Sequence, residues 1–472
     1  MKGLMLKQTL LVIFVSFISG CSNQYIAKQQ PQAARQDIPV NWQEGAVNLD
    51  NQQPFLELDL LFKQPQLRAL IQEATANNPD IQELALKMKA SDSMMIAIGA
   101  KQYPTLDLDI KKSRSKQEGD VTSSYQYGLN VAWEIDIWGK LADHNSAALA
   151  DYNVTKWEYQ AVTRNIAVRV VRLWIEGWAL NQSQLNAQNH LSKLLKIETV
   201  ILENYRNGIT QLEDLSSTRQ QQENTYADMI TTNEKINKNY REMSLLLGRL
   251  PDKSVLFDNN ELPHIVSPPL AIPAHALARR PDVQIAFSQL QSLDAQTRAS
   301  YKALLPSINL SGNISRLRNT GALNDFFSGS TVWSLVGGIT QPIFNANSLK
   351  AQANASSYNA EAAWWHYRKT ILTAVFEVEN ALALEQSFKV QKQHLYNAQQ
   401  QSLKVQQIYK DKYLSGSVDI VRLIEAQLKK LEVDARIIQT QAAQMDNRIL
   451  LALAMGYDIP NTLQHKEISP NG

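Results

Sequence analysis

Features that many membrane and secreted proteins contain are scarce in this 472-residue sequence. Cys21 is the only cysteine, which excludes a disulfide within the chain. No stretch reaches the roughly 18 apolar residues of a transmembrane helix, so the sequence predicts no bilayer-spanning helix. Any crossing of a membrane would then use strands, because only helices and closed strand assemblies satisfy their backbone hydrogen bonds in lipid.

Charge of one sign and catalytic patterns are also scarce. The net charge is +2 without a basic block of the kind that follows phosphates, so nucleic acid is not an expected partner. The seven histidines are scattered without metal-ligand spacing. The sequence lacks a phosphate-binding glycine loop, a nucleophile elbow and a metalloprotease helix. We therefore expect no enzyme activity, no bound metal and no cofactor.

Helix breakers are missing from two long stretches. Proline is absent from 105–250 and 343–459, and residues 345–414 contain no glycine. Such stretches are typical of long helices, here expected over 140–203 and about 345–412. Apolar residues recur every seven positions in the first of them, at Tyr159, Ile166, Leu173, Leu180, Ala187, Leu194 and Ile201. This seam predicts left-handed coiled-coil packing, and six of the seven positions 208 residues later are also apolar or aromatic.

The chain is internally duplicated. Asn78-Pro79-Asp80 returns as Arg280-Pro281-Asp282, an offset of 202 residues, and Gly208 and Gly248 return as Gly416 and Gly456, an offset of 208. The unit is far longer than the roughly 20–50 residues of a solenoid repeat, so we predict two similar half-structures. The predicted segments are a signal peptide at 1–20, an extended arm at 21–65, repeats at 66–248 and 275–456, a proline-rich linker at 249–274, and a tail at 457–472.

Each half is expected to hold one long helix beside two short ones. The glycine turns Asn207-Gly208 and Ser415-Gly416 end the long helices, and return helices follow over about 212–247 and 419–455. A shorter helix opens each half, over 79–102 and 281–303. Because one short helix cannot match the long one, we predict that the two short helices stack end to end.

Alternation of side chains predicts strand pairs at 104–138 and 306–344. Apolar residues occupy every second position from Tyr125 to Ile137, with Tyr125 and Trp133 near the two ends. A strand of 13 residues is about 43 Å long and can cross a bilayer even when the strand is tilted. The alternative is a soluble sheet with one buried face. Four strands cannot close a membrane barrel, so several chains would have to pool their strands.

The N-terminus has the pattern of a lipoprotein signal. Lys2 and Lys7 precede the nine apolar residues 10–18, and Ile18-Ser19-Gly20-Cys21 resembles a bacterial lipobox. The resemblance implies cleavage before Cys21 and its lipidation, with palmitate among the acyl chains. Ser22, rather than an aspartate, follows the cysteine and favours the outer membrane. The alternative is an ordinary signal peptide with a chance cysteine.

Together, the duplicated helix starts, strand pairs and glycine turns resemble the TolC family of outer-membrane efflux channels, most closely its OprM- and NodT-like lipoproteins. The resemblance implies a mainly α fold with membrane β-strands. It also implies a homotrimer with a 12-stranded β-barrel in outer-membrane lipid, continued by a periplasmic α-helical barrel. The implied partners are a periplasmic adaptor and an inner-membrane pump, for which the RND type is favoured. The chain would export small molecules as a passive conduit.

The resemblance also implies a periplasmic aperture at the helix turns. The matching positions are Asp214, Asp419 and Glu425, with Arg422 close enough to pair with a carboxylate and Tyr205 and Tyr413 just before the turns. Relatives carry a basic residue where this chain has Val418, which alters any ionic latch. Alternatively, these acids only favour helix N-termini. Gly208 and Gly416 are candidate adaptor-docking tips, or simply end their helices.

Two other functions fit parts of the sequence. A lipid-anchored periplasmic coiled-coil adaptor or tether would explain Cys21 and the seven-residue seam but not the alternating strand at 125–137. A protein-secretion conduit of the same fold would explain all three features. The exported compound cannot be read from the sequence, because a passive tube carries little substrate signature.

Overall fold

The computed structural model describes residues 38–43, 64–117, 120–251, 267, 273–318 and 330–457. The predicted signal peptide, Cys21, most of the arm and linker, and nearly all of the tail lie outside these residues. The chain divides into two compact units. One unit includes 86–156 and 285–369, and the other includes 36–85, 157–284 and 370–472.

The predicted helices are confirmed, and they are equal in length between the two halves. The long helices α5 (Lys140–Arg206) and α9 (Ser348–Leu414) each contain 67 residues. The return helices α6 (Leu212–Leu246) and α10 (Ile420–Ala454) each contain 35. The seven-residue seam faces other helices, because all its positions on α5 and α9 are buried or half-buried. Among the described residues, no helix is both long and apolar enough to cross a membrane.

Shorter helices open each half. They are α3 (Pro65–Asn77), α4 (Pro79–Ala100), α7 (Pro273–Ala278) and α8 (Pro281–Lys302). Sequence analysis did not predict α7, which is only six residues long. Proline occupies the first position of all four helices, where its missing N–H costs no hydrogen bond and its fixed φ suits the helix.

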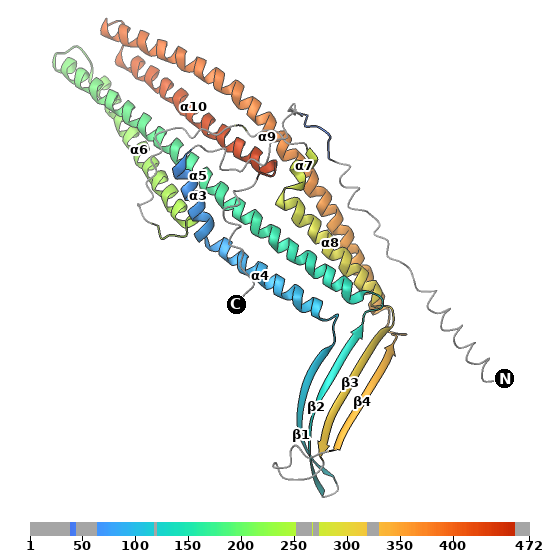
Figure 1. Cartoon of the computed structure of the whole chain (residues 1–472). Coiled ribbons are helices and arrows are strands. Elements are labelled where there is room, and N and C mark those ends of the chain that lie inside the picture. The colour runs from blue at the N-terminus through green and yellow to red at the C-terminus, as the bar shows by residue number, and fades with distance from the viewer. Residues whose placement is uncertain are drawn as a thin grey trace. The chain divides into compact units, whose positions relative to one another are not determined.

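Four strands form one antiparallel sheet in the order β1-β2-β3-β4 (Figure 1). The strands are β1 (Thr105–Gln117), β2 (Asp120–Ile135), β3 (Ser307–Arg318) and β4 (Ser330–Thr340). Their register places apolar residues opposite one another, as in the row Leu108–Leu129–Ile314–Trp333. The neighbouring row Asp109–Gly128–Ser315–Val332 lies on the other face, which is mainly polar. The predicted alternation is therefore confirmed and continues across both halves.

The predicted strand ends at Ile137-Trp138 and Ile343-Phe344 were wrong. β2 stops at Ile135, because Asp136 instead accepts a hydrogen bond from the Ala142 backbone N–H, 2.8 Å away, at the start of α5. The Trp138 indole donates to the Pro306 carbonyl at 2.7 Å and does not extend the strand. β4 stops at Thr340, two residues before Pro342, which cannot donate to a strand ladder.

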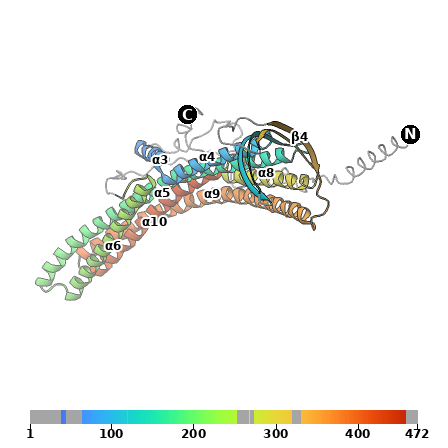
Figure 2. The same cartoon turned by 90° about the horizontal axis from the view of Figure 1, so that it is seen from below.

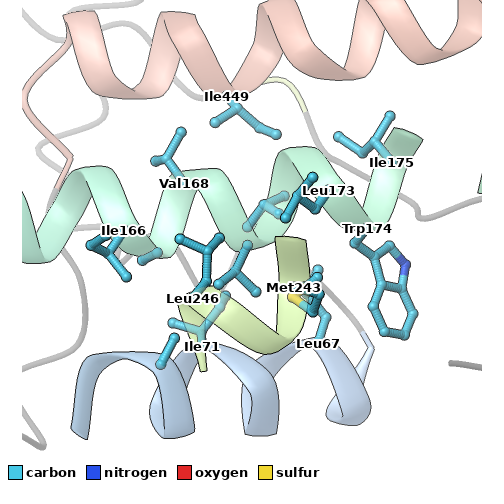
Figure 3. Packing of buried hydrophobic residues seen from close by; sticks show 14 of the residues in the cluster. Leu67, Ile71, Ile166, Val168, Leu173, Trp174, Ile175, Met243, Leu246 and Ile449 are labelled. Carbon is cyan, nitrogen blue, oxygen red and sulfur yellow. The ribbon is translucent and has the colours of Figure 1, made fainter. Parts of the chain in front are cut away.

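A large core joins five helices in the unit that includes 157–284. Figure 3 shows Leu67 and Ile71 of α3 facing Met243 and Leu246 of α6, with α5 beside them. Ile449 of α10 completes the same cluster. These side chains are almost fully buried, and burial of each stabilises the fold by about 1.5–3 kcal/mol. The core thereby ties the first half of the chain to the last helix of the second.

Hydrogen bonds repeat between the halves. The buried Asn239 side chain of α6 donates to the Leu173 carbonyl of α5 at 3.0 Å. At the same offset of 208 residues, buried Asn447 of α10 donates to the Ala381 carbonyl of α9 at 2.9 Å. Buried amides need such partners, because leaving one unsatisfied costs about 1–3 kcal/mol. The two hairpins thus share the same buried hydrogen bond at equivalent positions.

The predicted end-to-end stacking of the short helices is confirmed. The Asn78 side chain, at the start of α4, donates to the Leu246 carbonyl at the end of α6 (3.0 Å). In the second half, the Arg280 guanidinium donates to the Ala454 carbonyl at the end of α10 (3.3 Å). Each bond satisfies a carbonyl that a helix end would otherwise leave open.

The junction at Arg280 has more polar contacts than the junction at Asn78. The guanidinium is buried and also binds Asp282, through bonds of 3.0 and 2.7 Å, and Glu377 on α9. Burial alone would raise the pKa of Asp282, but the hydrogen bonds and charge of Arg280 outweigh it and lower that pKa. The ionised pair therefore contributes stability above the unfolded-state pKa of Asp, about 3.9, and loses it as pH falls through the lower folded value.

We predict that glycine is required more strongly at the junction than at the hairpin turn. Gly248 has φ of +71°, and a Cβ there would lie 2.6 Å from the Asn77 carbonyl oxygen. Gly208 has φ of +72°, but a Cβ there meets nothing within 4 Å. Both Ala substitutions add backbone strain of about 1–2 kcal/mol, and only Gly248→Ala adds a clash. Denaturant unfolding should show Gly248→Ala clearly less stable than Gly208→Ala; equal losses would contradict the packing argument.

Candidate functional site at the helix turns

The first hairpin turn is a tight helix cap with an open glycine. Gly208 donates to the Tyr205 carbonyl at 3.0 Å, and Ile209 donates to the Asn204 carbonyl at 2.8 Å. This pair of bonds is the Schellman arrangement, which satisfies the last carbonyls of α5 and requires positive φ at the glycine. The turn therefore ends α5 through backbone hydrogen bonds.

The second turn has the same geometry. Gly416 has φ of +72° and donates to the Tyr413 carbonyl at 3.0 Å, while Ser417 donates to the Lys412 carbonyl at 2.8 Å. A Cβ at Gly416 would meet nothing within 4 Å, as at Gly208. Both predicted tip glycines thus end their helices, and both leave open space beside the turn for another molecule.

Asp214 and Asp419 cap the return helices. Asp214 accepts a hydrogen bond from the Gln211 backbone N–H at 3.4 Å and closes a capping box with the Gln211 side chain. Asp419 is the N-cap of α10 and accepts from the Arg422 backbone N–H at 3.0 Å. Within one chain, both aspartates therefore make helix-capping contacts, as the alternative expectation holds.

The second turn also carries an exposed ion pair. The Arg422 guanidinium donates to Glu425 at 3.1 Å, one turn along α10. Both side chains are more than half exposed, so solvent screens the pair and it adds little stability. Asp419, Arg422 and Glu425 thus lie together on the first turns of α10, with their charges accessible to solvent.

Tyr413 packs against residues of both hairpins, whereas Tyr205 is exposed. Tyr413 is half-buried, and burial raises the pKa of its hydroxyl; the Asn204 side chain opposes this, and the charge of Asp214 adds to it. Asn204 and Asp214 belong to the first hairpin, so the structure brings Tyr413 of the second hairpin to Asp214.

An apolar cluster holds the turn ends of both hairpins together. Leu194 and Ile201 of α5 and Leu215 of α6 pack with Ile420, Leu423 and Ile424 of α10. Tyr409 and Tyr413 of α9 cover its edge. Figure 2 shows α6 beside α10 in this region. We name these eight residues the turn cluster; it joins the first turns of α6 and α10, where Leu215 follows Asp214 and Ile420 follows Asp419.

Sequence reasoning missed three exposed apolar residues at the turns. Ile209 and Leu212 follow the first glycine and are 71% and 57% exposed, and Leu414 precedes the second and is 72% exposed. The available signal was their position, since residues that flank a helix cap usually belong to the packed hydrophobic contact that accompanies it. Exposed here, they form apolar surface next to the open glycines.

The described part of the chain offers no group of three or more His, Cys, Asp or Glu side chains that could hold a metal ion. His190 is buried, and burial together with Lys193 lowers its pKa, so its ring is neutral at pH 7. What the turns present instead is capped helix ends, exposed carboxylates and apolar surface. This chemistry suits protein contact and control of ion passage.

Comparison with known proteins agrees with the duplicated architecture. The sequence profile described as "Outer membrane efflux protein" matches residues 70–249 and 272–457, one stretch in each half of the chain. The chain belongs to the outer membrane efflux protein family. The two matched stretches coincide with the two predicted repeats to within four residues at each end.

Individual relatives match nearly end to end. The cation efflux system protein CusC of Escherichia coli O6:H1 is 25% identical over 93% of this chain and 96% of its own length. SilC of Salmonella typhimurium, named as a probable outer membrane lipoprotein, is 26% identical over 84% of this chain and 86% of its own. A solved membrane protein from Pseudomonas aeruginosa superposes with a TM-score of 0.82 at 21% identity, covering 92% of this chain and 100% of that one. The predicted fold, that of outer-membrane efflux channels, is confirmed.

Proposed function

We propose that three copies of this chain form a passive channel that exports small molecules across the outer membrane. The observation that supports the proposal best is the sheet, whose single apolar face ends at two open edges, β1 and β4. An open edge cannot face lipid, because its N–H and C=O groups would lack partners. Pairing β4 of one copy with β1 of the next removes both edges, and three copies give a closed barrel of about 12 strands, within the range of membrane barrels.

The proposed partners follow from this placement. A periplasmic adaptor and an inner-membrane pump, favoured as the RND type, would supply substrate and energy, because the chain shows no nucleotide-binding motif. Cys21 would be lipidated after cleavage of the signal peptide and would anchor the chain to outer-membrane lipid. The name of SilC, an outer membrane lipoprotein, supports this anchor by analogy.

The alternative functions are less well supported. A periplasmic tether has no need for a sheet with exposed leucine and isoleucine along one face, such as Leu106, Leu108 and Ile110. A protein-secretion conduit shares the fold and remains the second candidate. The functions for which the relatives are named, such as cation efflux for CusC, favour small cargo.

Purified full-length protein tests the channel proposal. We expect heat-resistant trimers in detergent, enrichment in the outer-membrane fraction, and ion conductance in planar bilayers. Cys21→Ser should lose incorporation of labelled palmitate and keep the conductance, because the anchor lies outside the strand-bearing part. A non-conducting monomer that stays with the membrane only through Cys21, so that Cys21→Ser releases it into the soluble fraction, would reject the channel and favour the tether.

We further propose that Asp214, Asp419 and Glu425 of three chains ring the periplasmic aperture. The support is that Asp419 and Glu425 remain exposed while serving as cap and ion-pair partner, and that the turn cluster brings the two hairpins together. Arg422 would limit repulsion within the ring by pairing with Glu425. Tyr205 and Tyr413 would border the constriction, with Tyr413 coupled to Asp214.

The gate and cap roles can be separated by substitution. Asp419→Ala with Glu425→Ala should raise single-channel conductance in planar bilayers. Asp419→Ser with Glu425→Gln should raise it similarly, because serine retains N-capping but removes the charge. Glu432→Gln, an exposed charge farther along α10, should leave conductance unchanged. Wild-type conductance in the serine variant would assign any effect of alanine to lost capping, and would remove these acids from the gate.

We also propose that the two turns dock the adaptor. Gly208 and Gly416 leave open space beside exposed Ile209 and Leu414, which forms a small apolar contact surface at each turn. Glycine lets another backbone approach closely, and the flanking apolar side chains gain from being covered.

Asparagine at both glycines provides a sharp test of docking. Asn tolerates positive φ, so Gly208→Asn with Gly416→Asn should preserve the turns and the trimer while filling the open space. We expect cells carrying this variant to become as sensitive as a deletion strain to the compounds that the wild-type gene protects against. Retained protection with folded trimers would show that the glycines only end their helices.

A further inference from the structure

One face of the sheet changes from apolar to basic along β1. Leu106, Leu108 and Ile110 are followed on the same face by basic residues at the next three alternate positions, Lys112, Arg114 and Lys116. All six side chains are exposed. The change occurs toward the β1–β2 turn, at the end of the strands opposite to the end where α4 and α5 connect.

The register extends this basic zone to β3. Ile110 pairs with Tyr127, and Tyr127 pairs with Arg316, so all three share one face at one level. Arg316 is exposed. One step farther, Lys112 pairs with Tyr125, and its ammonium lies 5.3 Å from the centre of the Tyr125 ring. We call Lys112, Arg114, Lys116 and Arg316 the basic collar.

In the described part of the sheet, no acidic residue occupies a position on the collar's own face. Beyond Ile110, the register positions of this face within 112–116, 121–127, 316 and 331 hold no Asp or Glu. Neighbouring Lys111 points to the opposite face and there pairs with Asp109 at 3.6 Å. The positive charge is thus concentrated on the face whose remaining surface is apolar, at the level where tyrosines begin.

This order of apolar, aromatic and basic residues matches the layers of a lipid leaflet. Apolar side chains suit acyl chains, tyrosines suit the interface, and long basic side chains reach the headgroup phosphates while their methylene stems cover apolar surface. We propose that the basic collar binds the phosphates of anionic lipid headgroups at the outer interface of the membrane. The inference rests on the proposed function, which places this sheet in the outer membrane.

The lipid that fits best is lipid A, whose phosphates lie in the outer leaflet. Each Lys or Arg near an anionic surface strengthens binding by about fivefold. Three copies of the chain would repeat the collar around the barrel. All four collar residues of one site come from one chain, so that chain alone sets the affinity of the site. The collar would thereby fix the depth of the barrel in the membrane and recruit its own lipid shell.

The test measures binding of lipid A to purified full-length trimers by native mass spectrometry. Lys112→Gln, Arg114→Gln and Lys116→Gln together should weaken lipid A binding by at least about tenfold and leave phosphatidylcholine binding unchanged. The control variant Lys404→Gln, Lys410→Gln and Lys429→Gln removes three exposed charges from α9 and α10 and should bind like the wild type. Lys111→Gln, one residue away on the opposite face, should also bind like the wild type.

Two outcomes would overturn the inference. One is wild-type affinity for lipid A in the collar variant; the other is equal weakening in the α9–α10 control, which would show a general effect of net charge. Displacement of lipid A by equimolar inorganic phosphate would assign the site to a free anion instead. Failure of the channel proposal is recognised separately, because the wild type would then form no conducting trimer.

Discussion

The long helices depend on one continuous contact along their length. At 67 residues, α5 and α9 are each about 100 Å long, and an isolated helix gains little stability from its own propensity. The seven-residue seam must therefore be covered throughout, yet α6 and α10 contain only 35 residues each. The gap is closed by α4 and α8, which meet the return helices end to end. Continuous cover of the two long helices therefore depends on these junctions.

The two junctions show which part of the duplicated design is constrained. Asn78 and Arg280 are chemically unlike, but each donates to the last carbonyl of its return helix. What is retained is a donor at the position where one helix ends and the next begins. Arg280 adds two carboxylate partners, so the second junction carries more polar contacts than the first. The halves have diverged in residue type while keeping the backbone groups satisfied.

Much of this fold could be predicted from the sequence because its signals are local and repeated. The seven-residue seam indicates a helix, and the alternation at 125–137 indicates a strand. Long stretches without proline or glycine support the helices, and the duplication lets each signal be compared between the two halves. The strand end after Ile135 could not be predicted, since Asp136 and Ile137 continue the alternation of the strand, but Asp136 accepts a hydrogen bond from α5 and the Trp138 indole donates to Pro306. The proximity of Tyr413 to Asp214 was equally hidden, because packing between hairpins has no sequence period.

The same backbone conformation serves opposite purposes at the two ends of each hairpin. A Cβ added at Gly248 or Gly456 would lie 2.6 or 2.8 Å from a neighbouring backbone carbonyl oxygen. At Gly208 and Gly416 an added Cβ would face open space. Constraint is therefore concentrated at the junction, where the large core also lies, whereas the turns are held by helix-cap hydrogen bonds and the smaller turn cluster. Local opening follows the least-packed contacts, so motion of the hairpins should begin at the turns. Opening of the proposed gate would need to separate Ile420 and Leu423 from Leu215 and leave the junction intact, so the turn cluster would set how easily the proposed aperture opens.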